Sequence, residues 1–71
     1  MNIVLFETLE ARNILAPDDY RAGHIKKILK LKEGDSFKAG VVDVSTGVST
    51  ITRVGKKGIE FTYVEEKPAE S

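Results

Sequence analysis

The side chains with the clearest chemical potential in this sequence are basic, and they lie close together between positions 21 and 32. This stretch holds five of the eleven lysine and arginine residues and no acidic residue, although the formal net charge of the whole chain is zero. Positive charge that is segregated in this way suits an anionic partner. The pattern therefore predicts a phosphate-binding face, with the candidate residues Arg21, His24, Lys26, Lys27 and Lys30.

The same cluster has a second interpretation, in which it is only the solvated face of a surface helix. Lysine-rich faces are common, and hydrophobic periodicity does not choose between the two. His24 is equally open, since its ring could be structural and bonded to nearby backbone, or could stack on a base or bond to a phosphate of RNA. Basic residues that would extend a binding face are Lys32, Lys38, Arg53, Lys56 and Lys57.

Side chains suited to catalysis or metal binding are scarce. The chain has one histidine and no cysteine, so it has neither a disulfide framework nor a thiolate metal site. The adjacent acidic pairs at 18–19 and 65–66 fit a helix start and a solvated tail. Gly55 and Gly58 fit a hairpin rather than a phosphate-binding loop. We therefore expect no catalytic residue, no cofactor-binding residue and no metal site in this chain.

A helix over residues 17–32 is predicted to carry the basic cluster. Asp18 or Asp19 can cap its first turn, where the helix dipole favours a carboxylate. Apolar residues at helical spacing form a stripe that should be buried on a sheet beside Phe37 and Phe61, and this stripe consists of Ala22, Ile25, Ile28 and Leu29. Basic side chains flank the stripe, so the helix would have one apolar face bordered by basic residues.

Four β-strands are expected around this helix. Alternating or continuous apolar patterns place them at residues 2–6, 36–44, 48–54 and 59–64, with turns between them that are rich in glycine. Residues 7–16 have weak periodicity and are expected to form a connecting loop. The predicted fold class is mostly β with one helix, and closure of the strands into a small barrel plugged by the helix would protect their edges.

Length and composition place the chain among small soluble globular domains. It has 71 residues, of which 41% are hydrophobic and 31% are charged. No segment approaches the roughly 18 apolar residues of a membrane span, and residues 1–16 lack the pattern of a secretory signal. We therefore expect a cytoplasmic protein without a membrane partner.

The order of these features resembles the N-terminal domain of the RsmE family. An apolar first strand is followed by the motif Arg21-x-x-His24-Ile25-x-x-Ile28-Leu29-Lys30-Leu31 and by Gly34-Asp35 before a β meander. Members of this family are ribosomal RNA small subunit methyltransferases that modify ring nitrogen 3 of a uridine in 16S rRNA with S-adenosylmethionine. The resemblance covers residues 2 to about 64 and implies a small PUA-like β-barrel that binds RNA, with domain limits at 1–64.

The resemblance also implies a second domain, a knotted SPOUT-type methyltransferase domain that binds S-adenosylmethionine and forms a homodimer. That domain is absent from this chain, and residues 65–71 are expected to begin the inter-domain linker. The chain itself is therefore expected to be non-catalytic and to position 16S rRNA or the small ribosomal subunit. The matches to the family motif place this role on Arg21, His24 and Lys30. Lysine at position 30 stands where arginine is common, so it offers a point charge instead of a bidentate fork.

Two other functions fit the same sequence. The chain could be a structural module that docks on its own catalytic domain or dimer partner, with the lysines serving only solubility. It could also be a free-standing adaptor of the translation machinery with an SH3-like or OB-like barrel.

Overall fold

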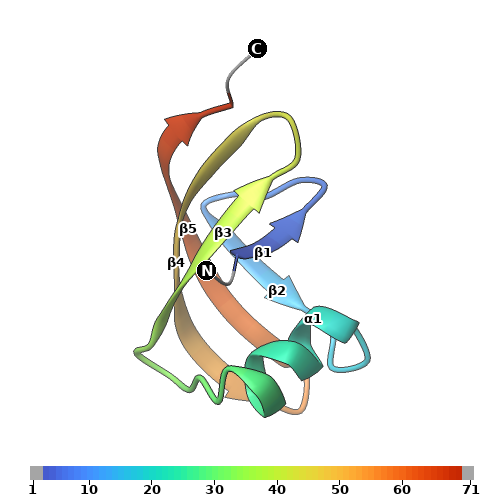
Figure 1. The fold of residues 1–71 in the computed structure, drawn as a ribbon. Helices are drawn as coiled ribbons and strands as arrows, with labels where there is room; N and C mark the ends of the chain where they lie inside the picture. Colours follow the sequence, from blue (N-terminus) through green and yellow to red (C-terminus); the bar gives the residue numbers. More distant parts are fainter. Residues whose placement is uncertain (1–2, 70–71) are drawn as a thin grey trace.

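A computed structural model describes residues 3–69, which form a five-stranded sheet with one short helix at one end (Figure 1). The strands are β1 (Ile3–Phe6), β2 (Arg12–Leu15), β3 (Ser36–Val41), β4 (Ser45–Gly55) and β5 (Gly58–Pro68). The helical segment begins as α1 (Tyr20–Gly23) and continues into a π-helical turn, η1 (His24–Ile28). The predicted fold class, mostly β with one helix, is confirmed. No helix in this described part is long and apolar enough to cross a membrane.

The sheet has the strand order β1-β3-β4-β5-β2, so β1 and β2 are its two edges. β1 pairs with β3 in parallel, and the other neighbours are antiparallel. The sheet curves strongly around its core (Figure 1), but among residues 3–69 it does not close into the predicted barrel. At the free edge of β1 the Leu5 carbonyl accepts a hydrogen bond from the Arg21 side chain rather than from a strand. The PUA-like detail stays a prediction.

The prediction of a connecting loop over residues 7–16 is wrong at residues 12–15, which form β2 and pair with the β5 residues 59–62. Only Leu15 of this four-residue strand is buried, so its own hydrophobic pattern is weak. The partner strand β5 lies more than forty positions away in the sequence, so the local hydrophobic pattern of β2 could not predict this pairing. β5 also continues past the expected end at 64, and Ser45 and Thr46 of β4 pair with Pro68 and Lys67. The linker assignment stays a prediction, and residues 70–71 lie outside the described residues.

The core lies between the concave face of the sheet and the helical segment. Phe61 is at its centre, with ring centroids 5.4 Å from Phe6 and 5.5 Å from Phe37. Ala22 and Ile25 cover this cluster from the helical side and are 1% and 0% exposed. The predicted burial of Ile25 beside Phe37 and Phe61 is therefore confirmed.

The predicted burial of Ile28 is wrong, because this side chain is 67% exposed. Residues 24–28 form a wider turn, in which the Leu29 N–H bonds to the His24 carbonyl and the Leu31 N–H bonds to the Ile25 carbonyl. A π-type turn advances by a smaller angle per residue than an α-helix, so Leu29 rather than Ile28 follows Ile25 on the buried side. Lys30 then ends the helix with a φ of 55°.

Candidate nucleic-acid interface

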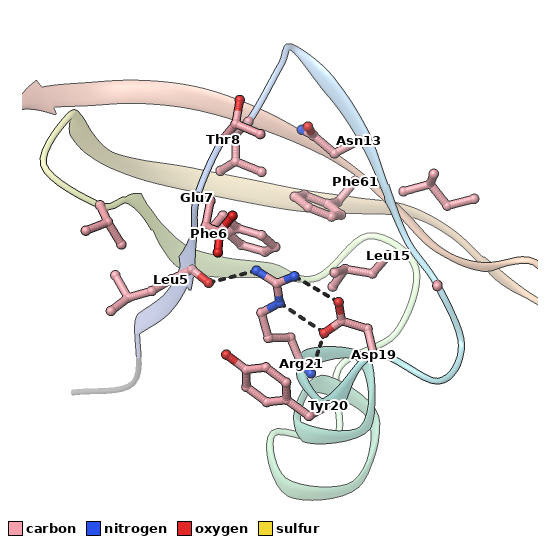
Figure 2. A pocket seen from close by; sticks show the side chains of 14 residues that line it. Leu5, Phe6, Glu7, Thr8, Asn13, Leu15, Asp19, Tyr20, Arg21 and Phe61 are labelled. Atoms are coloured by element: carbon pink, nitrogen blue, oxygen red, sulfur yellow. Dashed lines mark hydrogen bonds and ion pairs between the residues drawn. The ribbon is translucent and has the colours of Figure 1, made fainter.

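Arg21 is held at the junction of α1 and β1 by a dense set of contacts (Figure 2). Its Nε and Nη2 donate to the two carboxylate oxygens of Asp19 at 3.0 and 2.8 Å, and Nη1 donates to the Leu5 carbonyl at 3.1 Å. The guanidinium also lies 4.6 Å from the centroid of the Phe6 ring, which is favourable for a cation. These contacts tie the helix to the sheet edge and leave one N–H on each of Nη1 and Nη2 without a partner in the described residues.

Asp19 has two roles in this arrangement. It is the N-cap of α1, as the sequence predicted for Asp18 or Asp19, and its Oδ1 accepts the backbone N–H of Arg21 at 2.9 Å. The side-chain hydrogen bonds from Arg21, followed by this backbone bond, lower the pKa of Asp19 below its ordinary value. The same pairing raises the pKa of Arg21, which stays charged. The sequence predicted the cap but not the ion pair between Asp19 and Arg21. The signal available for the pair was the spacing of two positions between an acidic and a basic residue.

We expect an Asp19→Asn variant to be less stable than wild type near neutral pH, and to converge with it in acid. Asparagine still caps, so the loss is that of a partly exposed ion pair, about 0.5–1 kcal/mol, or about 2–8 °C in Tm for a domain of this size. A carboxyl whose pKa is lower in the folded state than its ordinary value of 3.8 stabilises the fold fully at pH values above 3.8. This contribution is lost as the pH falls through the folded-state pKa. Thermal melts from pH 7 down to about pH 2 measure the difference, and a gap that does not narrow as the pH falls below 3.8 would contradict the assignment.

A groove lies between β1, β2 and the start of α1, where the sheet remains open (Figure 2). It encloses about 710 Å³, and Phe6, Leu15 and Phe61 contribute apolar atoms to its walls. Its charged lining consists of Glu7, Asp19 and Arg21, so carboxylates outnumber the single guanidinium. This groove is therefore not favourable for a phosphate group.

The predicted lysines lie outside this groove and are free of partners. Lys26 and Lys27 of η1 and Lys30, which follows its C-cap Leu29, are all exposed. Between residues 3 and 69 the one ion pair is Arg21 with Asp19, so none of these ammonium groups is neutralised by a carboxylate. They form a compact cationic surface of the kind that binds phosphates.

His24 is intermediate in burial between the exposed lysines and the buried Ile25. Its side chain is half-buried, its carbonyl accepts the Leu29 N–H that defines the π turn, and its ring makes no hydrogen bond within the described part of the chain. Four of the five predicted residues thus lie on the helical segment, and Lys30 lies just after its C-cap Leu29. Arg21 is committed to the sheet edge, whereas the three lysines face solvent and His24 lies between them in sequence.

Two curated proteins are similar to this chain, whereas no protein-family model matches it. Ribosomal RNA small subunit methyltransferase E of Treponema pallidum is 42% identical in an alignment of 60 residues that covers 80% of the chain. Ribosomal RNA small subunit methyltransferase E 1 of Borreliella burgdorferi is 37% identical over 57 residues, again 80% of the chain. The chain belongs to the RsmE family. This RsmE-family chain spans 23% and 24% of the length of these two relatives.

Proposed function

We propose that this RsmE-family domain binds ribosomal RNA and positions 16S rRNA for methylation of a uridine with S-adenosylmethionine. In this proposal the methyl donor and the catalytic residues belong to the part of an RsmE protein that the chain does not span, and that part also forms a homodimer in the cytoplasm. Both relatives are named as methyltransferases of the small-subunit ribosomal RNA. A protein of this kind needs a surface that holds a large polyanion.

The observation that carries the proposal is the unpaired cationic surface made by Lys26, Lys27 and Lys30. Exposed lysines without carboxylate partners keep their full charge for phosphates, and each phosphate contact releases a condensed counterion. Arg21 supports this surface by fixing the helix on β1. Phosphate contacts position RNA without specifying its sequence.

The first test is a double variant, Lys26→Ala with Lys30→Gly. Glycine suits the left-handed backbone at position 30, so this variant should fold at least as well as wild type. If both lysines contact phosphates, affinity for a 16S rRNA fragment should fall roughly tenfold or more at about 0.1 M salt, and the slope of log affinity against log salt should flatten by about one to two units. Fluorescence anisotropy over a salt series measures both quantities.

The matched control is Lys67→Ala, which removes an exposed lysine near the end of β5. It should leave affinity and salt slope near wild type, because this lysine lies far from the helical lysines. Unchanged binding by the helix variant would reject the proposal, and so would an equal loss per lysine removed in the control, since binding would then follow net charge alone.

A docking role against the rest of an RsmE polypeptide is favoured by a different feature. On the outer face of the sheet, Val64, Val48, Lys38 and Ile3 form one cross-strand row. Ile3 and Val64 are 40% and 63% exposed, and the neighbouring Leu5 is 51% exposed. Apolar side chains grouped on a solvated face are typical of a contact surface. This role uses another face and is compatible with RNA binding.

A further inference from the structure

The hairpin that joins β4 to β5 carries a second group of basic side chains. Lys56 and Lys57 form its turn and Arg53 precedes it, and all three are exposed. They surround a shallow hollow of about 380 Å³ whose remaining lining includes Ile14 and Glu60. Glu60 faces Arg53 across the β4–β5 ladder and is the one acidic residue in this lining.

This hairpin lies at the same end of the molecule as the helical segment (Figure 1). The segment that leaves the helix is bonded to the end of β4, since Gly34 donates to the Ile51 carbonyl and Ile51 donates to the Asp35 carbonyl, both at 2.8 Å. The Val54 N–H also bonds to Glu33 Oε1 at 3.2 Å. The two basic groups are therefore held on one framework rather than on independent loops.

The molecule is elongated, with extents of 38, 22 and 20 Å along its three principal axes. Charge is distributed unevenly along the longest of them. The exposed basic residues at the helix end are Lys26, Lys27, Lys30, Lys32, Arg53, Lys56 and Lys57, and they outnumber the exposed acidic residues beside them, Glu33 and Glu60. The opposite end, where the β3–β4 turn meets the end of β5, carries Asp43, Glu65 and Glu66 together with a single exposed lysine, Lys67. The excess of positive charge thus lies at the helix end, and this asymmetry favours the approach of a polyanion to that end.

In residues 3–69 the basic end offers one exposed aromatic ring, that of Tyr20 at the start of α1, and no row of rings on which successive bases could stack. Phe6, Phe37 and Phe61 are buried, and Tyr63 is bonded to Ser45 Oγ at 2.8 Å. Tyr20 is the one strongly exposed ring in residues 3–69, and it lines the groove beside Arg21. Proteins that bind single strands combine a basic path with aromatic stacking platforms, whereas double-helical RNA is held largely by its shape and its phosphates.

We propose that the β4–β5 hairpin is a second phosphate-binding arm, and that it acts with the helical lysines to hold the backbone of double-helical RNA. This inference rests on the proposed RNA-binding function and names the class of RNA at that surface. The helical arm contacts one stretch of backbone and the hairpin arm a second, with the hollow between Arg53 and Lys57 open to a phosphate. Affinity comes from backbone contacts, so duplexes of unrelated sequence bind alike.

The test compares a Lys56→Ala/Lys57→Ala variant with wild type on a blunt RNA duplex of roughly 16 base pairs, a length that a duplex-binding domain can span, and on one of its single strands. We expect the variant to bind the duplex roughly tenfold or more weakly at about 0.1 M salt, with a salt slope flatter by about two units. Lys67→Ala is the control and should bind like wild type. Circular dichroism melts should be unchanged, since both mutated lysines are exposed in a turn.

Each other outcome overturns a defined part of the proposal. If the hairpin variant binds the duplex like wild type while the Lys26→Ala/Lys30→Gly variant is weakened, the second arm is rejected and the proposed function stands. If neither variant is weakened, the proposed function fails as well. If wild type binds the single strand more tightly than the duplex, the assignment to double-helical RNA is rejected.

Discussion

Replacing Ile25 with alanine should bring the domain close to unfolding at room temperature. Ile25 is fully buried and covers the aromatic cluster from the helical side. Truncation of a buried isoleucine costs about 2–5 kcal/mol in lost transfer energy and in the cavity that remains. A chain of this size has a total stability of only about 4–10 kcal/mol, so the variant should lose a large fraction of it. Urea unfolding followed by circular dichroism measures the change.

Ile28→Ala is the matched control, because it removes the same atoms three residues further along the same segment. Its side chain is 67% exposed, so the expected change lies within about 0.5 kcal/mol. A strong loss in both variants would mean that residues 24–28 form a regular α-helical turn in solution, because Ile25 is on the buried side of either turn whereas Ile28 is on the buried side of the α-helical turn only. The pair therefore tests the π turn itself as well as the core.

This turn marks the limit of what periodicity could predict in the helix. The apolar pattern found the right segment and placed Ala22 and Ile25 on the buried side, because that much is common to α- and π-type turns. The choice between Ile28 and Leu29 depends on whether the Leu29 N–H bonds four or five residues back. That bond is decided by how the segment fits over the sheet and by Lys30 adopting a left-handed backbone, neither of which a hydrophobic pattern encodes.

The sheet shows the same division between local and distant information. The β4–β5 hairpin was predictable because alternating side chains flank a turn that begins and ends with glycine. β2 was not, since its pairing partner is distant in sequence and only one of its four side chains is buried. Barrel closure was argued from the need to protect edges, but here a side chain, Arg21, occupies the free edge of β1.

The candidate site was predictable in its charge but not in its contacts. The clustering of lysines is visible in the sequence, and the exposure of Lys26, Lys27 and Lys30 agrees with a surface role. Arg21 looked equivalent to them, yet its partners Asp19 and Leu5 engage it within the fold. The proximity of the β4–β5 hairpin to the helix depends on backbone bonds between residues 33–35 and β4, which no linear pattern reveals.

Gly58→Ala should disrupt the junction of β2 and β5, which supports the hairpin. Gly58 has a φ of 121°, and a Cβ at this position would lie 1.8 Å from the Leu15 carbonyl oxygen. Neither atom can move freely, because Leu15 is buried and paired with Ile59 at the last position of the β2–β5 ladder. The backbone strain alone costs about 1–3 kcal/mol, and relief of the clash requires β2 to separate from β5, so we expect a loss of about 3 kcal/mol or more.

Gly55→Ala provides the control at the other end of the same turn. A Cβ on Gly55 meets no atom within 4 Å, and its φ is not in the left-handed region, so alanine there should change stability by less than about 1 kcal/mol. Hydrogen exchange adds a local readout: the Tyr63 N–H, which bonds to the Ala11 carbonyl beside β2, should lose protection in the Gly58 variant only. Equal stability of the two variants would mean that β2 does not depend on its close approach to Gly58, and that the sheet tolerates a free strand at this edge.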